Sequence, residues 1–116
     1  MRHHNKNKKF GRDKNQRHAL IRSLATSLIR DTKITTTEAK AKALRPYVEK
    51  LVTQAKNANL SDKRLLISKI HSEVASKTLI ETLAVKYLDR KGGYTRIIKL
   101  QPRLSDGAKM AVIEFV

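Results

Sequence analysis

The chain has 116 residues, a length that favours one domain with a single modest core. It carries 26 Lys and Arg against 10 Asp and Glu, so its formal net charge is +16 at pH 7. This charge predicts a polyanionic partner, and nucleic acid is the strongest candidate. The lack of cysteine excludes disulfides and thiolate metal sites, and no apolar run approaches the roughly 20 residues that cross a bilayer. We therefore expect no membrane partner.

The N-terminal segment is the most basic part of the chain. The first 22 residues hold eight Lys or Arg and one acid, Asp13, and Phe10 is the only large apolar residue between positions 2 and 18. Such a segment buries too little to offset the entropy lost when it becomes ordered alone. We interpret residues 1–15 as a basic arm that orders on a nucleic acid, and residues 16–116 as a single domain.

Two helices and a short strand are predicted first. An apolar stripe that ends at Ile29 predicts a helix over about residues 16–30. The β-prone segment 33–36 follows. Thr35 and Glu38 then have the spacing of a capping box, which predicts a second helix that reaches about residue 57. Pro46 lies within it and predicts either a kink or a helix that starts afresh there.

The remaining elements complete a mixed fold. Ser61 is the predicted cap of a third helix, and apolar spacing predicts a fourth helix that carries Leu79, Leu83 and Leu88 and is stopped by the glycine pair at 92–93. Segments 94–100 and 110–116 are rich in β-branched and aromatic residues and predict a hairpin, with the segment of Ile34 as a third strand. The expected architecture is α+β, with helices on one face of a small three-stranded sheet.

Aromatic residues are scarce. They are Phe10, Tyr47, Tyr87, Tyr94 and Phe115. The apolar patterns around Tyr47, Tyr87 and Phe115 predict that these three lie in the core. Too few rings remain to stack a single strand of bases, so we expect binding through backbone charge and shape, as is common for structured RNA.

No pattern indicates an enzyme. The ten acids are spread along the chain, and no phosphate-binding loop or activated nucleophile is present. The run Met1-Arg2-His3 has the spacing of an amino-terminal copper clamp, but any chain with histidine third shows this spacing. We expect no catalytic residue, no metal site, no cofactor and no small-molecule substrate.

Several motifs occur together in one order. The start Met1-Arg2-His3 precedes Ile34-Thr35-Thr36-Thr37, then Lys40-Ala41-Lys42, and finally Gly92-Gly93-Tyr94-Thr95-Arg96. Across its whole length the chain resembles the bacterial family of large-subunit ribosomal protein number seventeen. The resemblance implies a fold of helix, strand, three helices and two strands in two layers.

The same resemblance implies a function and a location. It implies a non-catalytic constituent of the large ribosomal subunit in the cytoplasm, one that binds large-subunit ribosomal RNA beside neighbouring ribosomal proteins near the exit of the nascent-chain tunnel. An architectural DNA-binding protein is the alternative. Such a protein needs a recognition helix that faces a groove of DNA, whereas the apolar stripes of the helices here all predict packing in one core.

We expect basic residues of three groups to contact RNA. The first group comes from the arm and first helix, the second from the second helix, and the third from the C-terminal part. Their members are Arg2, His3, Lys6, Lys8, Lys9, Arg12, Arg17, His18 and Arg22; Lys40, Lys42 and Arg45; and Arg90 and Arg96.

Overall fold

The computed structural model describes residues 9–57 and 59–116. Helix α1 (Lys14–Asp31) begins at Asp13, whose carboxylate accepts a hydrogen bond of 2.9 Å from the backbone N–H of Gln16. It ends at Thr32, which adopts a left-handed φ of 65°. The first predicted helix is therefore confirmed, and it starts two residues earlier than expected because an acidic cap precedes it.

A threonine cap separates strand β1 (Lys33–Thr37) from helix α2 (Glu38–Lys56). The hydroxyl of Thr37 accepts a hydrogen bond from the N–H of Lys40. The prediction that Thr35 caps this helix was wrong: Thr35 lies within β1, opposite Val112. Of the three consecutive threonines, the one that leaves the sheet last becomes the cap.

Helix α2 continues without a break through Pro46, so the predicted fresh start there was wrong. Proline cannot donate the hydrogen bond that the carbonyl of Lys42 would normally accept. Both Pro46 and Lys42 are exposed, so this carbonyl lies on the side of the helix that faces solvent. Water can satisfy it there, and the buried side of α2 keeps its hydrogen bonds.

Helix α3 (Leu60–Ile70) is capped by Asn59, whose side chain accepts a 2.9 Å hydrogen bond from the N–H of Asp62. The prediction of Ser61 as the cap was wrong, because Asn59, which also has a strongly favoured capping side chain, stands earlier in the chain and takes the position first.

The last helical segment has three parts. Helix α4 (Glu73–Thr78) is capped by Ser72, passes into the π-helical turn η1 (Leu79–Leu83) and ends in the short helix α5 (Ala84–Lys86). The apolar residues that predicted this helix begin at Leu79, six residues after the helical segment starts at Glu73. The predicted glycine stop was also wrong, because the helix ends six residues earlier and the glycines form the turn that follows it.

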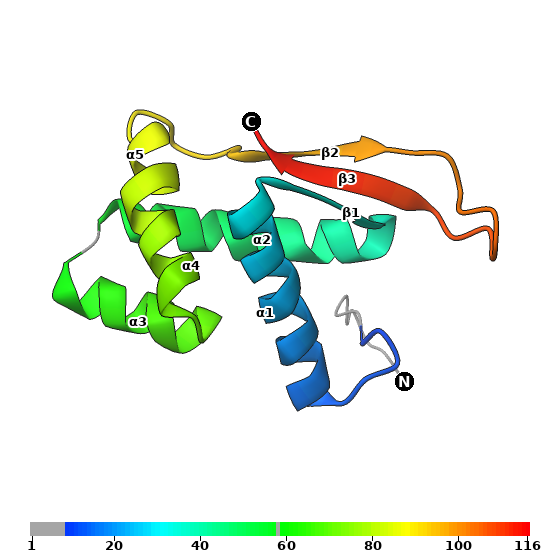
Figure 1. Cartoon of the computed structure of the whole chain (residues 1–116), viewed down its shortest axis with the longest axis horizontal. Helices are drawn as coiled ribbons and strands as arrows, with labels where there is room; N and C mark the ends of the chain where they lie inside the picture. The colour runs from blue at the N-terminus through cyan, green and yellow to red at the C-terminus, as the bar shows by residue number, and fades with distance from the viewer. Residues whose placement is uncertain (1–8, 58) are drawn as a thin grey trace, which may run out of the picture.

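The sheet has the order β1-β3-β2 and is antiparallel throughout, with β2 (Thr95–Lys99) and β3 (Met110–Phe115) forming the predicted hairpin. The side chains of Ala111, Ile113 and Phe115 are buried against the helices. Figure 1 shows α1, α2 and α3 on one side of the sheet, with α2 running along it and the segment from α4 to α5 rising beside the end of the sheet. The α+β prediction is confirmed.

Helix α2 is the centre of the core. Its buried side packs against the sheet, α1, α3 and the α4–α5 segment. Tyr87 and Phe115 are buried as predicted, with ring centroids 6.4 Å apart. Tyr94 is buried as well, although the sequence analysis did not place it in the core, and its ring centroid lies 5.3 Å from that of Tyr87. Tyr47 packs only against the edge of the core and remains partly exposed.

Candidate nucleic-acid interface

The first predicted group begins in front of α1. Arg2, His3, Lys6 and Lys8 lie outside the described residues.

The described part of this group forms a tight turn. The backbone N–H of Arg12 donates to the carbonyl of Lys9, and its guanidinium donates to the carbonyl of Phe10 at 2.7 Å. The guanidinium of Arg17 donates to the carbonyl of Arg12 at 2.9 Å. These two arginines fix the path of the chain into α1. Both side chains remain at least partly exposed to solvent.

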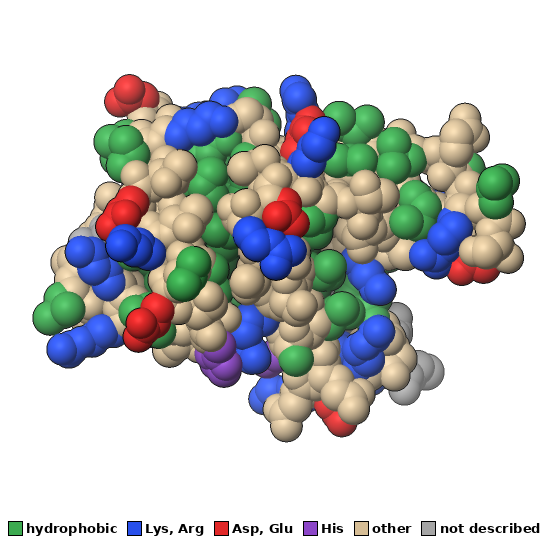
Figure 2. All heavy atoms as spheres, viewed as in Figure 1, with side chains coloured by type: hydrophobic (Ala, Val, Ile, Leu, Met, Phe, Trp, Pro, Cys, Tyr) green, Lys and Arg blue, Asp and Glu red, His purple; other side chains and the backbone are tan. Residues whose placement is uncertain are grey.

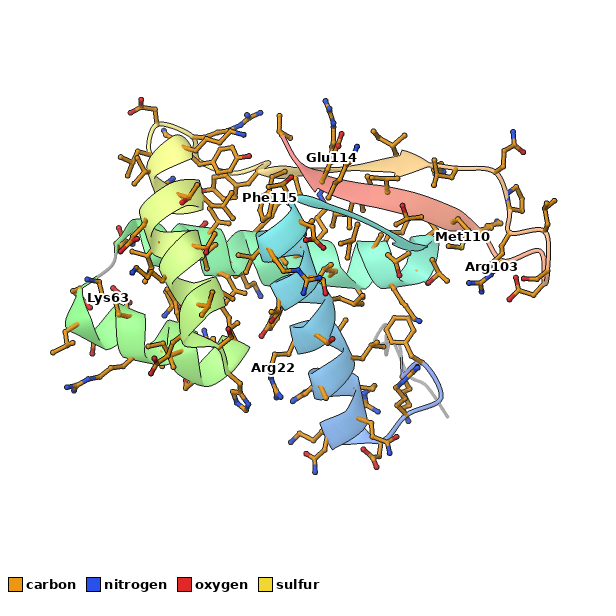
Figure 3. All side chains as sticks on the ribbon, in the orientation of Figure 1. Arg22, Lys63, Arg103, Met110, Glu114 and Phe115 are labelled. Carbon is orange, nitrogen blue, oxygen red and sulfur yellow. The ribbon has the colours of Figure 1, made fainter. Side chains whose placement is uncertain are left out.

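His18 and Arg22 lie together on one side of α1 and face a groove that we call the α1–α3 groove. It has a volume of about 790 Å³ and lies between α1, α2 and α3. Figure 3 shows Arg22 directed from α1 toward the end of α3, and Figure 2 shows basic and histidine side chains gathered at this notch. The residues that line it are His18, Ile21, Arg22, Ala43, Tyr47, Lys50, Leu51, Ser68 and Lys69.

The electrostatics of the α1–α3 groove are one-sided. Arg22, Lys50 and Lys69 contribute three cations from three helices, and none of the described residues that line the groove is an aspartate or glutamate. A concave surface with cations and no carboxylate concentrates positive potential and favours an anionic ligand.

Tyr47 lies within this groove. Its hydroxyl donates a 3.3 Å hydrogen bond to the carbonyl of Lys69, which ties α2 to the end of α3. Burial raises the pKa of Tyr47, and the charge of Arg22 offsets part of that rise. The ring therefore stays neutral and presents apolar surface between the cations.

The second predicted group divides into two. Lys42 forms an ion pair of 2.9 Å with Glu38, and Arg45 forms one of 3.3 Å with Glu49. The hydrogen bond from Lys42 lowers the pKa of Glu38. Lys40 differs from both: it forms no ion pair with a carboxylate of the described residues, and it is not among the residues that line the groove.

The third predicted group does not come together. Arg90 lies in the turn after α5, and its carbonyl accepts hydrogen bonds from the hydroxyl of Tyr94, at 3.2 Å, and from the ammonium of Lys56. Arg96 lies on β2 and forms an ion pair of 2.6 Å with Glu114 on β3. The two arginines therefore belong to different surfaces.

Tyr94 anchors the turn that carries Arg90. Its hydroxyl also lies 3.2 Å from that of Thr53 and 3.1 Å from the ammonium of Lys56. The hydrogen bond with Thr53, supported by Lys56, lowers the pKa of Tyr94. A second hollow of about 360 Å³ lies beside this turn, and Lys50 lines both it and the α1–α3 groove. This hollow is lined by Glu49 as well as by Lys50 and Lys91, so its charge is mixed, unlike that of the groove.

Within residues 9–57 and 59–116, no group of three or more His, Asp or Glu is placed to hold a metal ion. Among the helices of that same part of the chain, none is long and apolar enough to span a membrane.

Comparison with known proteins decides the family. The family described as ribosomal protein L17 matches residues 20–116. The chain is 51% identical to large ribosomal subunit protein bL17 of Sphingopyxis alaskensis, over its full length and 84% of that protein. It is 51% identical to bL17 of Methylacidiphilum infernorum over 99% of the chain and 88% of the relative, and 49% identical to bL17 of Nautilia profundicola over 100% and 98%.

The chain belongs to the ribosomal protein L17 family. This membership confirms the predicted resemblance and makes the chain a structural constituent of the large ribosomal subunit rather than an enzyme.

For this L17 family member, sequence reasoning found part of the groove and missed the rest. His18 and Arg22 were predicted, whereas Lys50 and Lys69 were not. Tyr47 and Lys50 stand four and seven residues after Ala43, so helical spacing could have placed all three on one side of α2. Lys69 had no such signal, because its position depends on how α3 packs against α2.

Proposed function

We propose that the chain binds large-subunit ribosomal RNA by neutralising phosphates and by matching the shape of the folded RNA. The observation that carries this proposal is the α1–α3 groove, where Arg22, Lys50 and Lys69 converge without a carboxylate. Phosphate contacts of this kind position a protein on RNA without reading its sequence.

The ion-paired cations form a second part of the proposed interface. Lys42, Arg45 and Arg96 each pair with a glutamate, and each of the three is about half exposed or more. Their glutamate partners are only 14–23% exposed, so a phosphate that takes the cation leaves a poorly solvated carboxylate behind. We expect these residues to contribute less to RNA affinity than the groove residues, which need give up no carboxylate.

The arm is the third part. Because α1 begins at Lys14, we now assign residues 1–13 to the arm. It carries Arg2, Lys6, Lys8, Lys9 and Arg12 with a single acid, so its role in this proposal is to add phosphate contacts beyond the folded domain. We also propose that the chain lies on the solvent side of the subunit, near the exit of the nascent-chain tunnel and beside other ribosomal proteins, as its family resemblance implies.

Salt dependence tests the proposal. Binding of the full chain to large-subunit ribosomal RNA should weaken with salt, with a slope of log K against log salt of about 0.7–0.9 per phosphate contact and several units in total. A variant that lacks residues 2–9 should keep its thermal unfolding temperature, bind more weakly and show a flatter slope. A slope near zero for the full chain would remove the electrostatic mechanism.

Competition separates RNA from DNA. Structured ribosomal RNA should displace duplex DNA of equal length from the chain, whereas an architectural DNA-binding protein would show the reverse order. Cross-linking of the chain within intact large subunits, followed by identification of the attached RNA segments and proteins, tests the position near the tunnel exit.

A further inference from the structure

We propose that the α1–α3 groove receives a single unpaired nucleotide of RNA, with its base against Tyr47 and Ile21 and its phosphate held by Arg22, Lys50 and Lys69. This inference rests on the proposed function and adds to it a defined binding pocket. It differs from the prediction of binding through backbone charge and shape, because it gives a base a specific place.

The shape and lining of the groove carry the argument. Its volume of about 790 Å³ lies within the range of pockets that bury small ligands, which is about 300–1,000 Å³. Its lining combines an aromatic ring and aliphatic side chains with cations. A nucleotide has the same two parts, because its base is flat and apolar on both faces and its phosphate is anionic. Apolar surface in the groove is therefore matched by the base, and positive charge by the phosphate.

The cations are available to a ligand. Lys69 donates through its ammonium to the neutral amide of Gln54, at 3.1 Å. Neither Arg22 nor Lys50 forms an ion pair with any carboxylate of the described residues. A phosphate in the groove would therefore meet three cations that have no carboxylate to release first. This distinguishes them from Lys42 and Arg45 on the neighbouring side of α2.

The position of Tyr47 is held from both ends. Its ring packs against the edge of the core, and its hydroxyl is fixed to the carbonyl of Lys69. A ring that is already positioned loses little entropy when a base stacks on it. Among residues 9–57 and 59–116, Tyr47 is the only aromatic residue that lines the groove, so the site accommodates one base rather than a continuous strand.

Four variants of the full chain test the proposal with large-subunit ribosomal RNA as the probe. Tyr47→Leu keeps apolar volume and removes the aromatic face, whereas Tyr47→Phe keeps the face and removes only the hydroxyl. The double variant Lys50→Gln with Lys69→Gln removes two groove cations. Its matched control is Lys63→Gln with Lys77→Gln, which removes two exposed cations outside the groove; Figure 3 shows Lys63 at the far end of α3 from Arg22.

The expected results differ in kind between the variants. Tyr47→Leu should weaken RNA binding by between about 5-fold and about 150-fold, as the loss of one base-stacking ring does, with no change in salt slope. Tyr47→Phe keeps the aromatic face and should therefore bind more tightly than Tyr47→Leu. The groove lysine variant should flatten the salt slope by about 0.7–0.9 per lysine, and the control should flatten it less. Thermal unfolding of each variant establishes that it is folded.

A second measurement uses the unaltered chain. Ultraviolet irradiation of its complex with RNA should attach a nucleotide to Tyr47, which mass spectrometry of the digested protein identifies. The proposal is overturned if Tyr47→Leu is folded and binds RNA as tightly as the original chain, or if no nucleotide is attached to Tyr47, because the groove would then hold phosphate only. Failure of the original chain to bind ribosomal RNA at all would instead overturn the proposed function.

Discussion

The turn between α5 and β2 contains two adjacent glycines with different backbone conformations. Gly93 has a φ of +63°, whereas Gly92 lies outside the left-handed region. A Cβ atom built at either position meets nothing within 4 Å. Replacing each glycine by alanine therefore tests backbone conformation alone, without a steric collision.

The magnitude follows from two opposing effects. A left-handed conformation costs an ordinary L-residue about 1–2 kcal/mol. Replacing glycine by alanine also restricts the unfolded chain, which stabilises the folded state by about 0.4–1 kcal/mol. Gly93→Ala should therefore lower the free energy of unfolding by about 1 kcal/mol, and Gly92→Ala should leave it unchanged or raise it by up to about 1 kcal/mol.

Thermal and urea unfolding of the two variants measure this difference. A loss of about 1 kcal/mol corresponds to a fall in Tm of about 4 °C in a domain of this size. Gly93→Asn should lose less than Gly93→Ala, because asparagine tolerates the left-handed region better. The reasoning is refuted if Gly93→Ala is as stable as Gly92→Ala.

Three further predictions concern the core and the loop between β2 and β3. Leu44→Ala should lower the free energy of unfolding by about 2–5 kcal/mol in urea denaturation, because Leu44 is fully buried and its loss leaves a cavity; an unchanged midpoint would contradict its place in the core. Tyr87→Phe should cost about 1 kcal/mol by the same assay, because it removes the 2.6 Å hydrogen bond from a buried hydroxyl to the carbonyl of Val116, and a variant of equal stability would show that the bond contributes nothing. The hydrogen bond from Arg103 lowers the pKa of Asp106 to about 2, so its stabilising effect is complete above pH 3.8 and is lost as the pH falls through about 2; titration by NMR should show this value, and Arg103→Gln should move it back toward 3.8.

The elements that depend on local periodicity could be predicted from the sequence. The apolar stripes of α1 and α2 and the β-branched composition of β2 and β3 each arise because one face of the element is buried. Such a pattern shows which face of an element is buried, whichever other element packs against that face. The hairpin was also predictable, since the two strands are close in sequence.

The ends of the elements were harder to predict. Thr35 and Thr37 have equal capping chemistry, and the choice between them depends on how far β1 stays paired with β3. The same applies to Asn59 and Ser61 in front of α3. In both cases the competing residues are chemically suitable, and tertiary structure selects one.

The candidate site was predictable only where it lies on one helix. His18 and Arg22 share a side of α1 by helical spacing, and both line the groove. Lys69 lines the same groove from α3, and no local sequence pattern predicts the angle at which α3 packs against α2. Sequence reasoning also assigned Tyr47 to the core, because an apolar pattern does not separate a buried ring from one at the edge.

The order of strands in the sheet has a consequence for synthesis of the chain. Strand β3 lies in the middle of the sheet, yet it is made after both of its neighbours. Helices close their hydrogen bonds locally and can form as they emerge, whereas β1 and β2 make none of the sheet's hydrogen bonds with each other and must wait for β3. Until then two strands have unpaired edges, the condition in which chains associate wrongly. Synthesis of β3 is therefore the step that joins β1 and β2 into one sheet.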